Sequence, residues 1–107
     1  MQILIHDADV VKVLLYSENR LVLHYESNDV NKIQQWKNFI AEDTVPLLKD
    51  CEPQGKIIFR TSEDSTVMNF SMKNGCTYVN YDLNEINYNK PLTDRGLQYI
   101  DSLMRVQ

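Results

Sequence analysis

The chain has 107 residues, of which 43% are hydrophobic and 24% are charged, and this ordinary globular composition predicts one folded domain over residues 1–107. Its formal net charge is −4, from 15 acidic and 11 basic residues, which argues against nucleic acid and anionic membranes as partners. The sequence contains only three glycines, so a glycine-rich phosphate-binding loop has almost nothing to be built from.

The first residues and the two cysteines bear on the compartment. Residues 1–7 lack a basic segment and break their apolar run after three residues, so we expect neither a signal peptide nor a transit peptide. No window approaches the ~18 apolar residues of a membrane span. We therefore expect a cytoplasmic protein. Cys51 and Cys76 lack the spacing of zinc ligands and are expected as reduced thiols, with a disulfide between them as the less favoured alternative.

Residues 10–16 and 21–26 predict a β-hairpin, because both segments are rich in β-branched and aromatic side chains and a polar turn separates them. The expected register pairs Tyr16 with Leu21, Leu14 with Leu23, Lys12 with Tyr25, Leu15 with Val22 and Val13 with His24. Both faces of the first strand are then apolar, which predicts a central strand covered on both sides. Residues 2–5 are a candidate for a short additional edge strand.

A helix is predicted over residues 29–42. Asn28 and Asp29 are good N-caps, and an apolar stripe at helical spacing follows them. The stripe consists of Val30, Ile33, Trp36 and Ile40. We expect Trp36 in the core rather than at a binding surface. Residues 53–55 are then predicted to form a loop.

The apolar period changes to two from Lys56, which predicts strands over 56–61, 66–73 and 76–83. The Asn74-Gly75 pair favours a tight hairpin turn between the last two strands. The register that this turn sets pairs Phe70 with Val79 and Met68 with Tyr81 on a core face, and Asn69 with Asn80 and Val67 with Asp82 on a solvent face.

The C-terminal residues complete the predicted order of elements. Residues 84–91 are rich in asparagine and are predicted as a loop. Thr93 is then expected to cap a helix with an apolar stripe of Leu97, Ile100, Leu103 and Met104, in which Gly96 is a modest penalty.

Together these elements predict an α+β fold with a mainly antiparallel sheet of five or six strands, in the order hairpin, helix, three-stranded meander, helix. In one architecture the first hairpin joins the edge of the last strand and the helices lie on opposite faces. In the other, both helices cover one face. The sequence does not decide between the two.

Two groups of residues are candidates for function. His6, Asp7 and Asp9, with His24 and Glu26, are candidate ligands for a divalent metal, and a small metal-dependent hydrolase is the enzymatic alternative. Since Asp7 and Asp9 are also typical of a polar turn, we expect no metal, no cofactor and no enzyme activity.

The second group is rich in tyrosine and asparagine, which are common in protein-binding surfaces. With nearby carboxylates it gives the candidate contact residues Tyr78, Asn80, Asp82, Glu85, Tyr88, Glu42 and Asp43. A tyrosine-rich strand face covered by the C-terminal helix is the competing interpretation.

The function that this composition favours is a small acidic protein-binding module. Its specific form is an inhibitor or immunity-type protein that neutralises a basic protein partner such as a toxin, because complementary charge speeds association. A secretion chaperone or a scaffold subunit is an alternative. A homodimer through apolar residues of the 10–26 hairpin is a further one.

Overall fold

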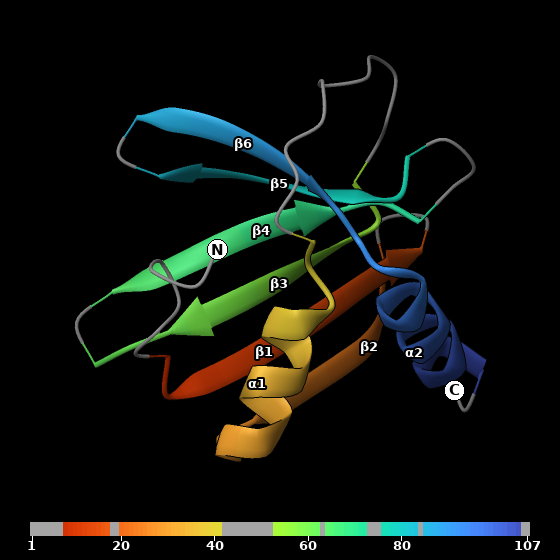
Figure 1. The fold of residues 1–107 in the computed structure, drawn as a ribbon. Helices are drawn as coiled ribbons and strands as arrows, with labels where there is room; N and C mark the ends of the chain where they lie inside the picture. Colours follow the sequence, from red (N-terminus) through yellow and green to blue (C-terminus); the bar gives the residue numbers. More distant parts are fainter. Residues whose placement is uncertain are drawn as a thin grey trace.

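A computed structural model describes residues 8–17, 20–41, 53–62, 64–72, 76–83 and 85–105. They form an antiparallel sheet of six strands and two helices, so the predicted α+β fold is confirmed (Figure 1). The elements are β1 (Val10–Ser17), β2 (Arg20–Ser27), α1 (Val30–Asn38), β3 (Gly55–Arg60), β4 (Ser65–Phe70), β5 (Tyr78–Leu83), β6 (Ile86–Pro91) and α2 (Asp94–Arg105). The additional strand expected at residues 2–5 lies outside the described residues.

The first hairpin joins the sheet through β1, which pairs with β3, so the strand order is β2-β1-β3-β4-β5-β6. The proposed junction with the last strand of the meander is therefore wrong. The observed junction aligns apolar side chains across the strands, because Val11 lies opposite Phe59 and Val13 lies opposite Ile57. β1 is an interior strand, as expected.

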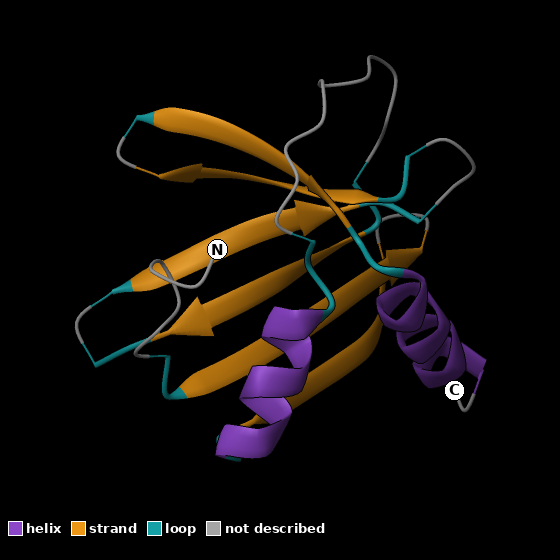
Figure 2. Cartoon of the chain, viewed as in Figure 1, coloured by secondary structure: helices purple, strands orange, loops and turns teal. Residues whose placement is uncertain are grey.

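Both helices pack on the same face of the sheet (Figure 2). The alternative with both helices on one face is confirmed, and the expected cover on the other face of β1 is not found among the described helices and strands. Along β1 the burial alternates, since Val13 is 0% exposed while Lys12 and Leu14 on the other face are only partly buried. The Leu14 side chain therefore lies on a partly exposed strand surface and not in a second core.

The hairpin register differs from the predicted one because the ladder shifts between Leu15 and Tyr16. Tyr16 pairs with Leu21 as expected, whereas Leu15 pairs with Leu23 rather than Val22. The remaining predicted pairs are each displaced by one residue: Leu14 lies opposite His24, Val13 opposite Tyr25 and Lys12 opposite Glu26. A bulge that adds one residue to β2 has this effect, and it brings Leu15 and Leu23 onto the helix-covered face.

Helix α1 is shorter than predicted at its C-terminal end. Asp29 is the N-cap, and its side chain accepts a hydrogen bond of 2.7 Å from the Asn31 backbone N–H. Past Asn38 the backbone leaves the helix and pairs with the chain after β6, because Ile40 forms a bridge with Leu92. This pairing competes with further helical turns and explains why the helix does not reach residue 42.

Helix α2 begins where expected, since Thr93 Oγ1 accepts a 3.0 Å hydrogen bond from the Gly96 N–H. Gly96 is more than a local penalty. A Cβ atom at this position would lie 2.7 Å from Phe39 Cβ, so glycine lets the first turn of α2 approach the end of α1. The predicted stripe is confirmed for Ile100, which is fully buried, and for Leu97 and Leu103, which pack against the core.

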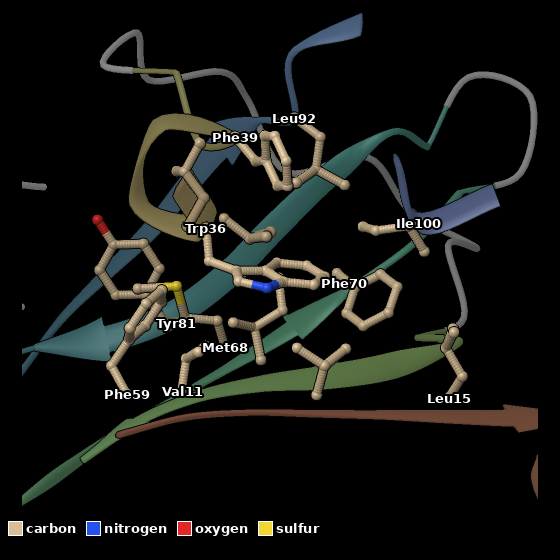
Figure 3. Packing of buried hydrophobic residues seen from close by; sticks show 14 of the residues in the cluster. Val11, Leu15, Trp36, Phe39, Phe59, Met68, Phe70, Tyr81, Leu92 and Ile100 are labelled. Carbon is tan, nitrogen blue, oxygen red and sulfur yellow. The ribbon is translucent and has the colours of Figure 1, made fainter. Parts of the chain in front are cut away.

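Trp36 is at the centre of the core, between the helices and the sheet (Figure 3). Its ring centroid lies 5.3 Å from that of Phe39, 5.5 Å from that of Tyr99 and 5.7 Å from that of Tyr25. The side chain is fully buried, as predicted, and its Nε1 is buried without a hydrogen-bond partner. An unpaired donor of this kind costs about 1–3 kcal/mol, which the surrounding aromatic contacts must outweigh.

The largest departure from the predicted elements is β6, because residues 86–91 form a strand where a loop was expected. β5 and β6 are joined by a tight turn in which Glu85 has a φ of 68°. β6 pairs with β5 along its length, from Leu83–Ile86 to Tyr78–Pro91.

Cys76 is disulfide-bonded, and no described cysteine is free. The expectation of a reduced thiol is therefore wrong for Cys76. Cys51 is the only other cysteine of the sequence and lies outside the described residues. Among the helices that the structure describes, none has the length and apolar character to cross a membrane.

Candidate functional site

The sheet has a second face, turned away from both helices, which we call the open face. Along each strand, residues whose side chains point to this face alternate with residues whose side chains point to the core. No described helix or strand lies over the open face (Figure 1). The ladders assign to it Val10, Lys12, Leu14, His24, Glu26, Lys56, Ile58, Arg60, Val67, Asn69, Asn80, Asp82, Asn87 and Asn89.

Basic side chains gather on the β1–β3 half of the open face. Lys12 lies opposite Ile58, so Lys56 and Arg60, two residues to either side, are its diagonal neighbours. Such neighbours are ~7–8 Å apart, within reach of long side chains. These three cations lie beside the apolar side chains of Ile58 and Val67, and Glu26 lies opposite Lys12 on the neighbouring strand.

The β5–β6 half differs from the β1–β3 half in its pairing, because the part of β5 beyond Asn80 does not pair with β4. β4 pairs with β5 only at Asn69–Asn80 and Phe70–Val79. The two predicted pairs beyond them, Met68–Tyr81 and Val67–Asp82, are not formed. Residues 81–88 are thus held together mainly as a two-stranded hairpin, visible as the diverging pair of strands in Figure 1. We call residues 80–89, which include the Asn80–Asn89 pair at the base of this hairpin, the arm.

A network of side-chain amides holds the open side of the arm. Asn80 Nδ2 donates to Asn89 Oδ1 at 2.6 Å and to Asn87 Oδ1 at 2.8 Å. Asn87 Nδ2 donates in turn to Asp82 Oδ1 at 2.7 Å and to Asn80 Oδ1 at 3.3 Å. These bonds cross from β5 to β6. They fix the Asp82 carboxylate and add to a two-stranded structure that is marginal on backbone pairing alone.

The other side of the arm packs on the core. Tyr81 is 2% exposed, and its ring stacks on that of Tyr88 with centroids 5.3 Å apart and planes 19° apart. Lys90 Nζ lies 5.8 Å from the centroid of the Tyr88 ring, within the range of a cation–π contact. The arm is therefore supported on both sides, by amides on one and by stacked rings on the other.

The tip of the arm carries negative charge. Asp82 and Glu85 are exposed, and residues 81–88 include no basic residue. Ile86 beside them is 54% exposed, one of few large apolar side chains with that much exposure among the described residues. The tip therefore exposes the carboxylates of Asp82 and Glu85, the amide of Asn87 and the apolar side chain of Ile86.

The predicted contact residues are brought together only in part. Asn80 and Asp82 share the open side of the arm, and Glu85 is in the turn between its strands. Tyr78 is 7% exposed and offers little contact area. Tyr88 belongs to strand β6 rather than to the predicted loop, and its side chain lies on the core side of that strand. Glu42 and Asp43 lie outside the described residues.

Ile86 and Asn87 belong to the candidate site but are not among the contact residues predicted from the sequence. Their signal is the alternation of residues 86–91, in which Asn87 and Asn89 fall on one side of a strand and Tyr88 and Lys90 on the other. Asparagine is uncommon in strands, and this composition obscures the alternation.

The proposed metal ligands do not form a site among the described residues. His24 Nε2 and Glu26 Oε1 are 3.8 Å apart, and both side chains are about half exposed, at 49% and 52%. Asp9 is exposed, and His6 and Asp7 lie outside the described residues. No group of three potential ligands that could hold a metal ion occurs in the described part of the chain. Comparison of the chain with family models, curated proteins and solved structures finds no match.

Proposed function

We propose that the chain is a non-catalytic protein-binding module and that the tip of the arm contacts a basic protein partner. The observation that carries this proposal is the exposure of Asp82, Glu85 and Ile86 together on a hairpin that is supported from both sides. A contact surface held in place before binding loses less conformational entropy on association than a loose loop would lose.

The chemistry of the tip supports a partner with lysine or arginine side chains. Asp82 Oδ1 accepts one hydrogen bond from Asn87, and an ionised carboxylate has further acceptor positions for a guanidinium or an ammonium group. Ile86 adds an apolar contact of the kind found at the centre of protein interfaces.

The net charge of −4 supports attraction of a basic partner at long range, which raises the association rate. An inhibitor or immunity-type protein that masks a basic toxin is the specific form that we propose. The disulfide at Cys76 favours an oxidising compartment as the place of action, in contrast to the cytoplasm expected from the sequence.

Photo-crosslinking of this chain to proteins in an extract of the source cells tests the proposal. A benzophenone amino acid replaces Ile86 at the tip or, as the control, Val30, which is 73% exposed on α1. We expect a basic protein crosslinked from position 86 and not from position 30, with purified partner binding more weakly at high salt. Equal capture from both positions, an acidic partner or affinity indifferent to salt would refute the proposal.

A homodimer is a second candidate, favoured by exposed apolar residues at the end of the first hairpin. Tyr16, Leu21 and Val22 are 39%, 53% and 38% exposed. We propose that these side chains pack against those of a second copy. Light scattering should then show a mass above 12.5 kDa that returns to this value in Leu21→Lys. A mass that stays at 12.5 kDa across concentrations would exclude the dimer.

A further inference from the structure

An open groove of about 500 Å³ runs between helix α1 and the start of α2, on the helix-covered side of the molecule. This volume is within the range of sites that bind small ligands or short peptides, roughly 300–1,000 Å³. The lining residues are Asn31, Gln34, Gln35, Asn38, Phe39, Thr93 and Arg95. The groove is separate from the arm and shares no residue with it.

One wall of the groove consists of four side-chain amides. Asn31, Gln34, Gln35 and Asn38 are spaced so that they share one side of α1, away from the buried Ile33 and Trp36. Gln34 Nε2 donates a 3.2 Å hydrogen bond to Asn38 Oδ1, which orients two of the four amides. Each amide offers both a donor and an acceptor, as a peptide backbone does.

The opposite wall carries a positive charge. Arg95 is exposed, and it is the only charged residue among the described residues that line the groove. The Thr93 N–H donates to the Phe39 carbonyl at 2.8 Å, which fixes the start of α2 beside the end of α1. Arg95 is therefore placed toward the Asn38 end of the amide row. The Gly96 N–H donates to Thr93 Oγ1, and the Arg95 guanidinium adds a full positive charge at this end of the groove.

We infer that this groove binds a short extended peptide that carries a carboxylate. The amide row spans ~10 Å along α1, at 1.5 Å per residue, which is the length of about three residues of extended chain. The amides would pair with the peptide backbone, and Arg95 would bind the carboxylate through two parallel hydrogen bonds. The carboxylate is either a peptide C-terminus or an aspartate or glutamate side chain.

Three acetylated tripeptides distinguish these sources in titrations followed by amide NMR of the whole chain. The first is Ala-Ala-Ala with a free C-terminus, the second is Ala-Ala-Asp with an amidated C-terminus, and the third is amidated Ala-Ala-Ala. We expect saturable shifts at Arg95, Gly96 and the α1 side-chain amides with the first, the second or both. The neutral third peptide should bind at least about tenfold more weakly, the loss typical of one charge-assisted interaction.

Arg95→Gln is the decisive variant, and Arg60→Gln, on the open face, is its control with the same change in charge. Arg95→Gln should weaken the carboxylate peptides about tenfold, while Arg60→Gln leaves their affinity unchanged. Gln34→Ala should weaken binding of all three peptides. Equal binding of the neutral peptide, equal effects of the two arginine variants or no saturable shift with any peptide would overturn the inference. None of these results depends on the partner of the arm.

Discussion

Val67 and Met68 are neighbours in β4, yet Val67 is 43% exposed on the open face and Met68 is 0% exposed on the helix-covered face. The exposed fraction alternates in the same way along β1 and β3. The covered face holds the aromatic cluster around Trp36, whereas the open face mixes cations, amides and apolar side chains. Packing on the covered face therefore accounts for stability, and no described helix or strand covers the open face.

The largest expected effect is on the covered face, at Trp36. Trp36→Ala should lower the free energy of unfolding by about 3–5 kcal/mol, because it leaves a cavity among Tyr25, Phe39 and Tyr99. Trp36→Phe should cost only about 1–2 kcal/mol, since it also removes the unpaired Nε1 donor. Urea denaturation measures both. Equal losses in the two variants would contradict this description of the core.

A smaller change in the free energy of unfolding is expected for Gly96→Ala, and its sign tests how closely the two helices pack. Helix propensity alone predicts a gain of about 1 kcal/mol from alanine. The contact with Phe39 instead predicts a loss of about 1–3 kcal/mol, because the added Cβ must displace the end of α1. Urea denaturation decides the sign, and Ser102→Ala in the exposed part of α2 is the control. A stabilised Gly96→Ala variant would show that the helices pack less closely than described.

Asn80→Ala tests whether the amide network supports the arm. The change removes hydrogen bonds to Asn87 and Asn89 and should cost about 1 kcal/mol. The loss should be local, so amide hydrogen exchange should accelerate in β6 while β1 and β3 keep their protection. Uniform acceleration through the sheet, or none in β6, would mean that the arm does not depend on this network.

The smallest effect is a pH dependence on the covered face. Burial raises the pKa of the Tyr99 hydroxyl above its ordinary value, and the nearby Tyr25 adds to the shift through charge and a hydrogen bond. The folded state therefore favours the neutral phenol. This contribution is complete below a pH of about 10, the unfolded pKa, and is lost as the pH rises through the folded pKa. Denaturation of Tyr99→Phe should show a shallower loss of stability at alkaline pH, and identical profiles would contradict it.

The sequence predicted the elements whose patterns are local. The caps at Asp29 and Thr93 and the buried Trp36 follow from residue type and spacing, and the Asn69–Asn80 and Phe70–Val79 pairs agree with the register set by the Asn-Gly turn. The bulge after Leu15 and the end of α1 depend on pairing with distant strands, which no local pattern encodes. β6 was missed because its stability comes from amide pairs across two strands rather than from β-branched side chains.

Affinity for the crosslinked partner measures most directly whether the arm is the binding surface. The double variant Asp82→Asn, Glu85→Gln is compared with Asp9→Asn, Glu26→Gln, which neutralises the same number of exposed carboxylates away from the arm. We expect the arm variant to bind at least about tenfold more weakly, with the control close to the wild-type chain and unfolding unchanged within about 0.5 kcal/mol in both. Equal losses in the two variants, or wild-type affinity in the arm variant, would contradict the assignment of binding to the arm.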